Sequence, residues 1–198
     1  MRKLLAFFAV SLFSVCLCQT LHAEVADSSS DDLRVYARFD MGFSIGETKF
    51  GKKGADSDSI AEIGGLCNTA LGVGIGRSRF EIAYQERDSV SELISTMLGI
   101  NSRFDAFSFM ANAYYDYSKS EQFAMYIGAG AGSDRYHWQT SIWGQEQKGR
   151  GWFFIGGLYT GMAFLWTNVA WDIGLDYYYI NEPETSSFVP KTGFRIRF

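Results

Sequence analysis

The chain has 198 residues, a formal net charge of −4 and an excess of aromatic residues and glycine, with 17 Phe, 11 Tyr, 5 Trp and 21 Gly. Its mean hydropathy of −0.06 excludes a bundle of transmembrane helices, because each such helix needs about 20 consecutive apolar residues. The acidic balance also makes nucleic acid a poor partner, since nucleic-acid binding depends on clustered Lys and Arg.

The first 23 residues have the layout of a secretory signal peptide. Arg2 and Lys3 form a basic start, an apolar run extends from Leu4 to Cys18, and Ala23 supplies a small residue at the predicted cleavage site. Removal of this segment takes the formal net charge from −4 to −6. Cys67 is then the only remaining cysteine, so the exported chain has no partner for an intramolecular disulfide.

Residues 24–32 are polar and acidic, and strict alternation begins after them. In the stretch RVYARFDMGFSI (34–45) the odd positions are apolar and the even positions are mostly polar or glycine. A period of two places these sets on opposite faces of a β-strand.

The same alternation recurs along the chain. Further strands are predicted within residues 70–76, 79–85, 104–117, 123–134, 151–166, 169–179 and 192–198. The segment 151–166 is apolar on both faces, so its orientation stays open. Eight strands in all are expected.

The predicted connections alternate in length. Short turns fall near Arg77–Ser78, at 119–122 and near Thr167–Asn168, whereas long polar stretches occupy 46–65, 86–102, 139–151 and 181–191. Short turns at one end and long loops at the other are typical of an up-and-down antiparallel barrel. Both termini then lie at the short-turn end.

The composition of the polar face decides which face points inward. It is rich in glycine and carries charges of both signs, which suits the enclosed interior of an eight-stranded barrel, where ions must be paired. The apolar face, which ends in Tyr and Trp, suits lipid. The sequence therefore predicts a transmembrane β-barrel with a lumen charge network, made of Arg34, Arg38, Asp40, Arg79, Glu81, Asp116, Asp172, Asp176, Arg195 and Arg197.

The chain ends inside its last strand, in KTGFRIRF (191–198). We expect this strand to close against the first one and leave no edge. Its Arg195 and Arg197 are expected to point into the lumen, with Asp172 and Asp176 on the neighbouring strand as their partners.

The signal peptide, the alternating segments, the asymmetry of the connections and the terminal GFRIRF resemble the small outer-membrane β-barrel family, of the opacity or OmpA-barrel type. The resemblance covers the whole exported chain as a pattern, without a sharp motif. It implies that Phe194, Ile196 and Phe198 form the C-terminal signal that the barrel assembly machinery reads.

A lipid A-modifying or phospholipid-modifying enzyme is the main alternative. It would need an activated nucleophile, and the exported chain has one histidine, His137, with Asp134 three residues before it and Ser141 four after it. This spacing does not match the His and Ser two positions apart expected from deacylase barrels. We therefore predict no catalytic residues and treat His137 as a rim residue beside Tyr136 and Trp138.

The sequence also gives little support for metal binding or for passage of solutes. Asp56, Asp58 and Glu62 lack the register of a calcium loop, so neither a metal site nor a cofactor is expected. The lumen of an eight-stranded barrel has just enough room for its side chains. A narrow, low-conductance porin is therefore kept only as a further alternative.

The long loops are the predicted place of function. Within 89–100, apolar residues fall at helical spacing after Ser89 and Glu92, which match a capping box. The candidate interaction residues are Val90, Leu93, Ile94, Met97, Leu98 and Trp143. A short helix there would either bind a partner or cover the barrel mouth.

The sequence thus predicts a signal peptide at 1–23, a periplasmic leader at 24–32 and an outer-membrane barrel at 33–198. We expect a monomeric, non-enzymatic protein of a Gram-negative-type envelope, with a role in envelope integrity or surface interaction through loops 46–66 and 86–102. The expected partners are outer-membrane lipid and lipopolysaccharide, the assembly machinery, and an extracellular ligand or host surface.

Overall fold

A computed structural model describes residues 33–50, 58–89, 101–142, 145–181 and 184–198, and the side chains within 33–47, 63–88, 105–137, 149–181 and 184–198. Its strands are β1 (Leu33–Phe50), β2 (Asp58–Ile75), β3 (Ser78–Ser89), β4 (Asn101–Lys119), β5 (Phe123–Ile142), β6 (Gln145–Leu165), β7 (Val169–Asn181) and β8 (Glu184–Arg197). In the part of the chain that is described, no helix has the length and apolar character needed to cross a membrane.

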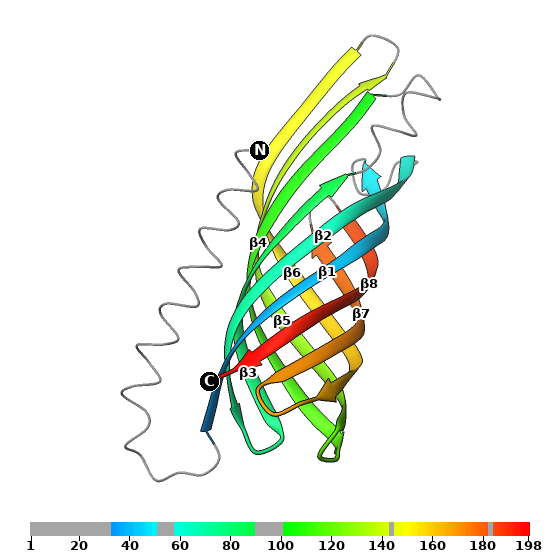
Figure 1. The fold of residues 1–198 in the computed structure, drawn as a ribbon. Coiled ribbons are helices and arrows are strands. Elements are labelled where there is room, and N and C mark those ends of the chain that lie inside the picture. Colours follow the sequence, from blue (N-terminus) through cyan, green and yellow to red (C-terminus); the bar gives the residue numbers. More distant parts are fainter. Residues whose placement is uncertain (1–32, 51–57, 90–100, 143–144, 182–183) are drawn as a thin grey trace.

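The strands form a closed antiparallel barrel in chain order (Figure 1). Closure occurs where β1 pairs with β8, with Ala37 opposite Ile196 and Phe39 opposite Phe194. The backbone N–H of Phe198 also donates to the carbonyl of Val35 at 3.0 Å. The predicted eight-stranded barrel and its closure by the terminal strand are confirmed.

Short turns join the strands at the end that holds the chain terminus, where the sequence predicts them. Gly76 has a φ of 59°, which glycine adopts without strain, and it lets β2 turn directly into β3. Between β4 and β5, the Ser120 hydroxyl accepts a hydrogen bond from the N–H of Phe123 at 3.1 Å. Between β6 and β7, the N–H of Trp166 donates to the Val169 carbonyl at 2.8 Å.

At the opposite end the strands continue well beyond the predicted limits. β1 and β2 pair as far as Phe50 and Asp58, and β5 and β6 pair as far as Ile142 and Gln145. The expectation that 46–66, 139–151 and 181–191 are loops was therefore wrong over most of each range. The polar composition misled the assignment because strand pairing outside a membrane depends on backbone hydrogen bonds and not on apolar side chains.

The extra strand length is uneven around the barrel. β4 and β5 pair up to Asn101 and Ser141, whereas pairing of β3 with β4 starts at Asp88 and Asp105. On the other side, pairing of β6 with β7 stops at Ile155 and Ile180. The ends of β4, β5 and β6 consequently project beyond the barrel as a three-stranded sheet, which Figure 1 shows in green and yellow.

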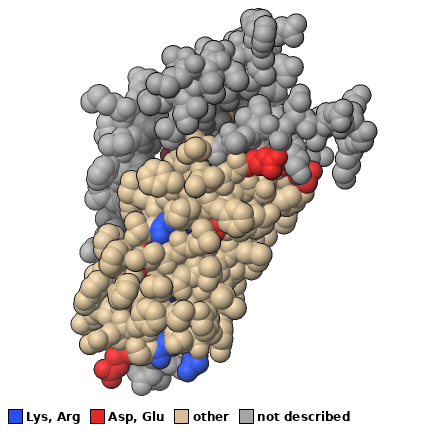
Figure 2. Space-filling model, turned by 90° about the vertical axis from the view of Figure 1, so that its right-hand side faces the viewer, with Lys and Arg blue, Asp and Glu red and all other residues tan. Residues whose placement is uncertain are grey.

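The barrel wall is apolar on the outside. Ile82 is 74% exposed, Phe43 67% and Leu158 61%. Figure 2 shows a face on which only a few charged atoms interrupt the uncharged wall. Within 151–166, which the sequence left without an orientation, Ile155, Tyr159 and Ala163 point inward.

Candidate functional site

The centre of the lumen is organised around Arg38. Its Nε lies 3.0 Å from Oδ2 of Asp40 and its Nη2 lies 3.1 Å from Oε2 of Glu81. The same Nη2 donates to the hydroxyl of Tyr114 at 3.0 Å. The hydroxyl of Tyr36 donates to the other carboxylate oxygen of Glu81 at 2.9 Å. One guanidinium thus neutralises two carboxylates that lie on different strands, β1 and β3.

A second cation, Lys191 of β8, extends this cluster. Its Nζ lies 2.8 Å from Oδ2 of Asp176 and 3.5 Å from Oδ2 of Asp40. Asn68 donates to that same oxygen of Asp40 at 2.9 Å. The hydroxyl of Tyr178 donates to Asp176 at 2.8 Å. Asp40 is therefore held by groups from three strands, β1, β2 and β8.

Three further ion pairs lie above and below the centre. Arg79 donates to Oδ1 of Asp116 through Nε at 3.1 Å and Nη2 at 3.0 Å. Arg195 pairs with Asp172 at 3.1 Å. Towards the projecting sheet, Arg87 of β3 reaches Asp134 of β5, which also accepts a hydrogen bond from the hydroxyl of Ser108.

Tyrosine rings fill the space between these ions. Tyr114 stacks on Tyr159 with ring centroids 5.3 Å apart, and it meets the edge of Tyr126 at 5.8 Å. The guanidinium of Arg79 lies over both Tyr114 and Tyr126, at 4.9 and 4.8 Å from the ring centroids. Such cation–π contacts attach the rings to the charges.

Glycine on β5 makes this filling possible. A Cβ built on Gly128 would lie 2.5 Å from the ring of Tyr114. A Cβ on Gly130 would collide with Oδ1 of Asn112 and would lie 2.6 Å from the hydroxyl of Tyr159. The rings of β4 and β6 therefore occupy space that only glycine leaves free.

The charges of the interior nearly balance. Among the described residues, the buried cationic side chains are Arg38, Arg79, Arg87, Lys191 and Arg195. The buried carboxylates are Asp40, Glu81, Asp116, Asp134, Asp172 and Asp176. Because each of these carboxylates has a cation within 3.5 Å, the interior avoids the large penalty of an unpaired buried ion.

The structure places eight of the ten predicted lumen residues inside the barrel, namely Arg38, Asp40, Arg79, Glu81, Asp116, Asp172, Asp176 and Arg195. Arg34 is exposed and Arg197 is half-buried, both at the short-turn end. Asp176 takes Lys191 as its partner, and Arg197 donates to the carbonyl of Trp166 at 3.0 Å. The expected ion pair of Arg197 with Asp172 or Asp176 is therefore not formed, and Lys191 pairs with Asp176 in its place. Register explains this, since Lys191 lies opposite Gly174 and so next to Asp176.

Three members of the network were missed by the sequence. Arg87 and Lys191 fell in stretches assigned to loops. Asp134 was placed on the polar face of its strand and considered beside His137, but it was not included in the predicted charge network. A usable signal was present, since Arg87 continues the odd-numbered inward positions Arg79 and Glu81 of the same strand. Extending the predicted strand 79–85 by two residues would have placed Arg87 in the lumen.

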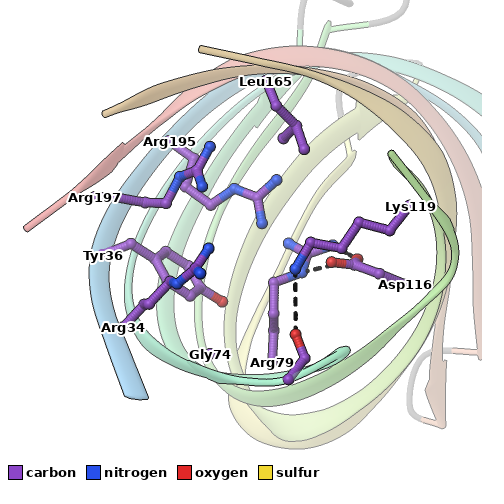
Figure 3. A pocket seen from close by; sticks show the side chains of 10 residues that line it. Arg34, Tyr36, Gly74, Arg79, Asp116, Lys119, Leu165, Arg195 and Arg197 are labelled. Atoms are coloured by element: carbon purple, nitrogen blue, oxygen red, sulfur yellow. Dashed lines mark hydrogen bonds and ion pairs between the residues drawn. The ribbon is translucent and has the colours of Figure 1, made fainter. Parts of the chain in front are cut away.

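The short-turn end opens into a pocket of about 40 Å³ lined by residues of β1, β2, β3, β4 and β8 and by Leu165 of β6 (Figure 3). Its charged lining residues are Arg34, Arg79, Asp116, Lys119, Arg195 and Arg197. At this rim, burial lowers the pKa of Lys119. Asp116 acts in the opposite direction, and the positive charges of Arg34, Arg197 and Arg195 lower the pKa further. The pKa of Arg197 is lowered by burial and by Arg195 and Arg34. The pocket is a crowded cationic site.

The other predicted sites are dispersed. The side chains of Val90, Leu93, Ile94, Met97, Leu98 and Trp143 lie outside the described residues, as do those of Asp56, Asp58, Glu62 and Ser141. Asp134 points into the lumen while His137 is exposed, so β5 holds them on opposite faces. In the proposed C-terminal signal, Phe194 and Ile196 are 54% and 44% exposed on the outer wall, and Phe198 is half-buried.

A closed barrel with an apolar outer wall and an interior of paired charges has the reverse polarity of a soluble barrel. This arrangement and the fold define the protein as a small eight-stranded outer-membrane β-barrel. In this class the short turns are periplasmic and the longer connections are extracellular. The cationic pocket therefore opens to the periplasm, and the projecting sheet to the cell exterior.

Among solved structures, the crystal structure of Neisserial surface protein A is similar, with a TM-score of 0.63, 21% identity and coverage of 83% of this chain and 97% of that chain. The N-terminal β-barrel domain of Pseudomonas aeruginosa OprF has a TM-score of 0.52 and 16% identity, covering 82% and 97%. A major outer membrane protein of Thermus thermophilus has a TM-score of 0.50 and 11% identity, covering 82% and 99%. No protein-family model matches the chain, and no curated protein matches it. The likeness concerns the fold.

Proposed function

We propose that this protein is a non-conducting, non-enzymatic outer-membrane barrel that supports the envelope and carries an extracellular sheet for contact with a ligand or surface outside the cell. The observation that carries the proposal is the interior, where paired ions and stacked tyrosines cross the lumen between strands that are not neighbours. Arg38 with Glu81 and Arg87 with Asp134 are such pairs. A lumen filled in this way leaves the exterior loops and sheet as the part that meets other molecules.

The projecting ends of β4, β5 and β6 favour surface interaction over a purely structural role. The β5–β6 hairpin remains paired from Tyr136 and Gly151 out to Ile142 and Gln145, beyond the last pair of β6 with β7. The outer edge of β6 in this region has no strand beside it among the described residues. Extended, partly unpaired strands are suitable for binding extended segments of other proteins.

The two rival functions differ in what they need from the barrel. A channel needs a continuous aqueous path, which the Arg38 cluster and the ring of Tyr114 oppose. An enzyme of the rim needs His137 beside a carboxylate and a nucleophile. Asp134, the carboxylate considered with it, is buried on the other face and bound to Arg87. Asp105 of β4 lies opposite His137, and the side chain of Ser141 lies outside the described residues. The filled lumen therefore opposes the channel, and the separation of Asp134 from His137 removes the pair considered for the enzyme.

Planar bilayer recording of the refolded protein tests the closed lumen. We expect no stable channels from the wild type, and openings after the double change of Arg38→Ala and Tyr114→Ala, which removes the central filling. Heat-dependent gel mobility checks that the variant is folded. Large, stable wild-type channels would show that the proposed closed barrel is wrong.

A hairpin replacement tests the surface role. Residues 140–147 are replaced by Asn-Gly, which joins the paired residues Gln139 and Lys148 by a two-residue turn. We expect the barrel to assemble and cells that express it to lose adherence to epithelial monolayers relative to wild type. As a companion assay, mass spectrometry of lipid A should find no difference between wild type and His137→Ala. Unchanged adherence would contradict the proposed surface role. A changed lipid A profile would support the alternative of a lipid A-modifying enzyme.

A further inference from the structure

The periplasmic mouth carries more positive charge than its carboxylates neutralise. Of the cations that line the pocket, Arg79 is paired with Asp116 and Arg195 with Asp172. The other three, Arg34, Lys119 and Arg197, have no ion-pair partner among the described residues. They come from β1, β4 and β8 and converge on one opening (Figure 3).

The hydrogen bonds of two of these cations hold them in place without neutralising them. Nζ of Lys119 donates to the carbonyl of Gly76 at 3.2 Å, and Nη2 of Arg197 donates to the carbonyl of Trp166 at 3.0 Å. Both carbonyls belong to periplasmic turns, so the turns fix the cations at the rim. Burial lowers the pKa of Lys119 and Arg197, and the neighbouring positive charges lower it further. An anion placed between these cations offsets that repulsion.

The pocket has the size and walls for a compact anion. Its volume of about 40 Å³ is room for roughly three water molecules, which the oxygens of one small oxyanion can replace. Tyr36 and Leu165 form part of its lining, and the paired Arg79 and Asp116 close its inner side. Arg79 and Asp116 are buried, whereas Arg34 and Lys119 are exposed, so a ligand approaches from the periplasmic side.

We infer that this mouth, lined by Arg34, Lys119 and Arg197, is a binding site for a phosphate group. Guanidinium groups present several N–H donors in a plane and match phosphate oxygens well, and an ammonium adds a point charge. A carboxylate has two oxygens, whereas a phosphate offers an acceptor to each of the three cations. The inference concerns the periplasmic end and does not depend on the surface role proposed for the other end.

Two sources present the same chemistry. One is the headgroup of a phospholipid in the periplasmic leaflet, which lies beside the rim. The other is a free phosphate or phosphomonoester in the periplasm. The mouth lies where the barrel leaves the bilayer, so both can reach it.

Calorimetric titration of inorganic phosphate into the full exported chain in an uncharged detergent, at constant ionic strength, tests the site. We expect saturable binding that weakens at least about tenfold in Arg34→Gln/Lys119→Gln, because charge-assisted hydrogen bonds are removed. The matched control is Arg135→Gln/Arg150→Gln, which removes the same charge from exposed positions nearer the extracellular end. Arg197 is left unchanged in the first variant because it lies in the closing strand, and Arg197→Gln is tested separately.

The leader offers a competing anion, since Asp31 and Asp32 directly precede Leu33 in the sequence. A third variant, Asp31→Asn/Asp32→Asn, separates the two. Phosphate affinity that is equal or higher in this variant supports a phosphate site. If the Asp31→Asn/Asp32→Asn variant no longer binds phosphate, the proposed phosphate site is wrong.

Lipid discs distinguish the sources. If the ligand is a headgroup, discs that contain phosphatidic acid raise the thermal midpoint of the wild type relative to pure phosphatidylcholine discs, and the mouth variant loses this shift. If it is a soluble phosphate, added inorganic phosphate raises the midpoint in phosphatidylcholine discs and phosphatidic acid does not. The inference is wrong if phosphate binding is absent, or if the mouth variant and the extracellular control weaken it equally.

Discussion

Arg38 of β1 and Glu81 of β3 form an ion pair across the strand that separates them, with Nη2 and Oε2 3.1 Å apart. Neighbouring strands lie about 4.8 Å apart, so these two strands are roughly twice that distance from each other along the wall. Contact is possible because the sheet curves tightly enough for long side chains to meet inside. The ion pairs of this barrel therefore act as cross-braces between strands that share no backbone hydrogen bonds.

Replacement of the central cation should be the most damaging single change in the lumen. Arg38→Met leaves the carboxylates of Asp40 and Glu81 buried with less compensation, which we expect to lower the free energy of unfolding by about 3–5 kcal/mol. The measurement is urea unfolding of protein refolded into lipid bilayers, followed by tryptophan fluorescence. Arg77→Met, at an exposed turn, is the control and should change the value by less than about 0.5 kcal/mol. Equal effects at the two positions would contradict the bracing role.

The barrel could be predicted from the sequence because its two faces differ at every second residue. From Val35 to Ile45 the parity of each residue assigns it to lipid or lumen, and the same kind of alternation in β7 and β8 put Asp172 and Arg195 inside. Their contact at 3.1 Å then depends on the register of β7 against β8, in which Asp172 lies opposite Gly193. Charge sign and parity together identified most of the network.

What the sequence could not give was the length of the strands and the choice of partners. Arg87 and Lys191 lie in polar stretches where the apolar half of the pattern fades, although backbone pairing continues through them. Lys191 displaces Arg197 as the partner of Asp176 because it lies nearer along β8. The cationic pocket arises from residues far apart in the chain, Arg34, Lys119 and Arg197, which meet only after the barrel closes.

The close packing at Gly130 makes a second prediction. A methyl group there would collide with Asn112 and crowd the hydroxyl of Tyr159, so Gly130→Ala should destabilise the barrel by about 1–3 kcal/mol through overpacking. Gly65→Ala is the control, since a Cβ at Gly65 meets nothing within 4 Å. Folded fractions come from heat-dependent gel mobility across a urea series. The packing argument fails if the two alanine variants unfold at the same urea concentration.

Cys67 provides a direct measurement of which face is outside. It lies between the inward residues Leu66 and Asn68 and is partly exposed, so its side chain points towards lipid. A fluorophore attached to Cys67 should be strongly quenched by brominated lipid. In a Cys67→Ser background, Tyr117→Cys near the periplasmic turn of β4 should be quenched less and should react faster with a charged, water-soluble maleimide. Rapid reaction of Cys67 itself with that reagent in a bilayer would invert the assignment of faces.

The terminal residue allows assembly to be separated from stability. Phe198 adds one backbone hydrogen bond to β1, from its N–H to the carbonyl of Val35 at 3.0 Å, and an alanine can form the same bond. Phe198→Ala should therefore change urea stability in vitro by less than about 1.5 kcal/mol. If Phe198 is part of the assembly signal, the same variant should accumulate several-fold less folded barrel in the outer membrane of cells. Phe164→Ala, which removes a similar ring from the lipid face of β6 near the periplasmic turn, should assemble at the wild-type level. Equal loss of both variants from the membrane would mean that the terminal ring acts only through burial in lipid.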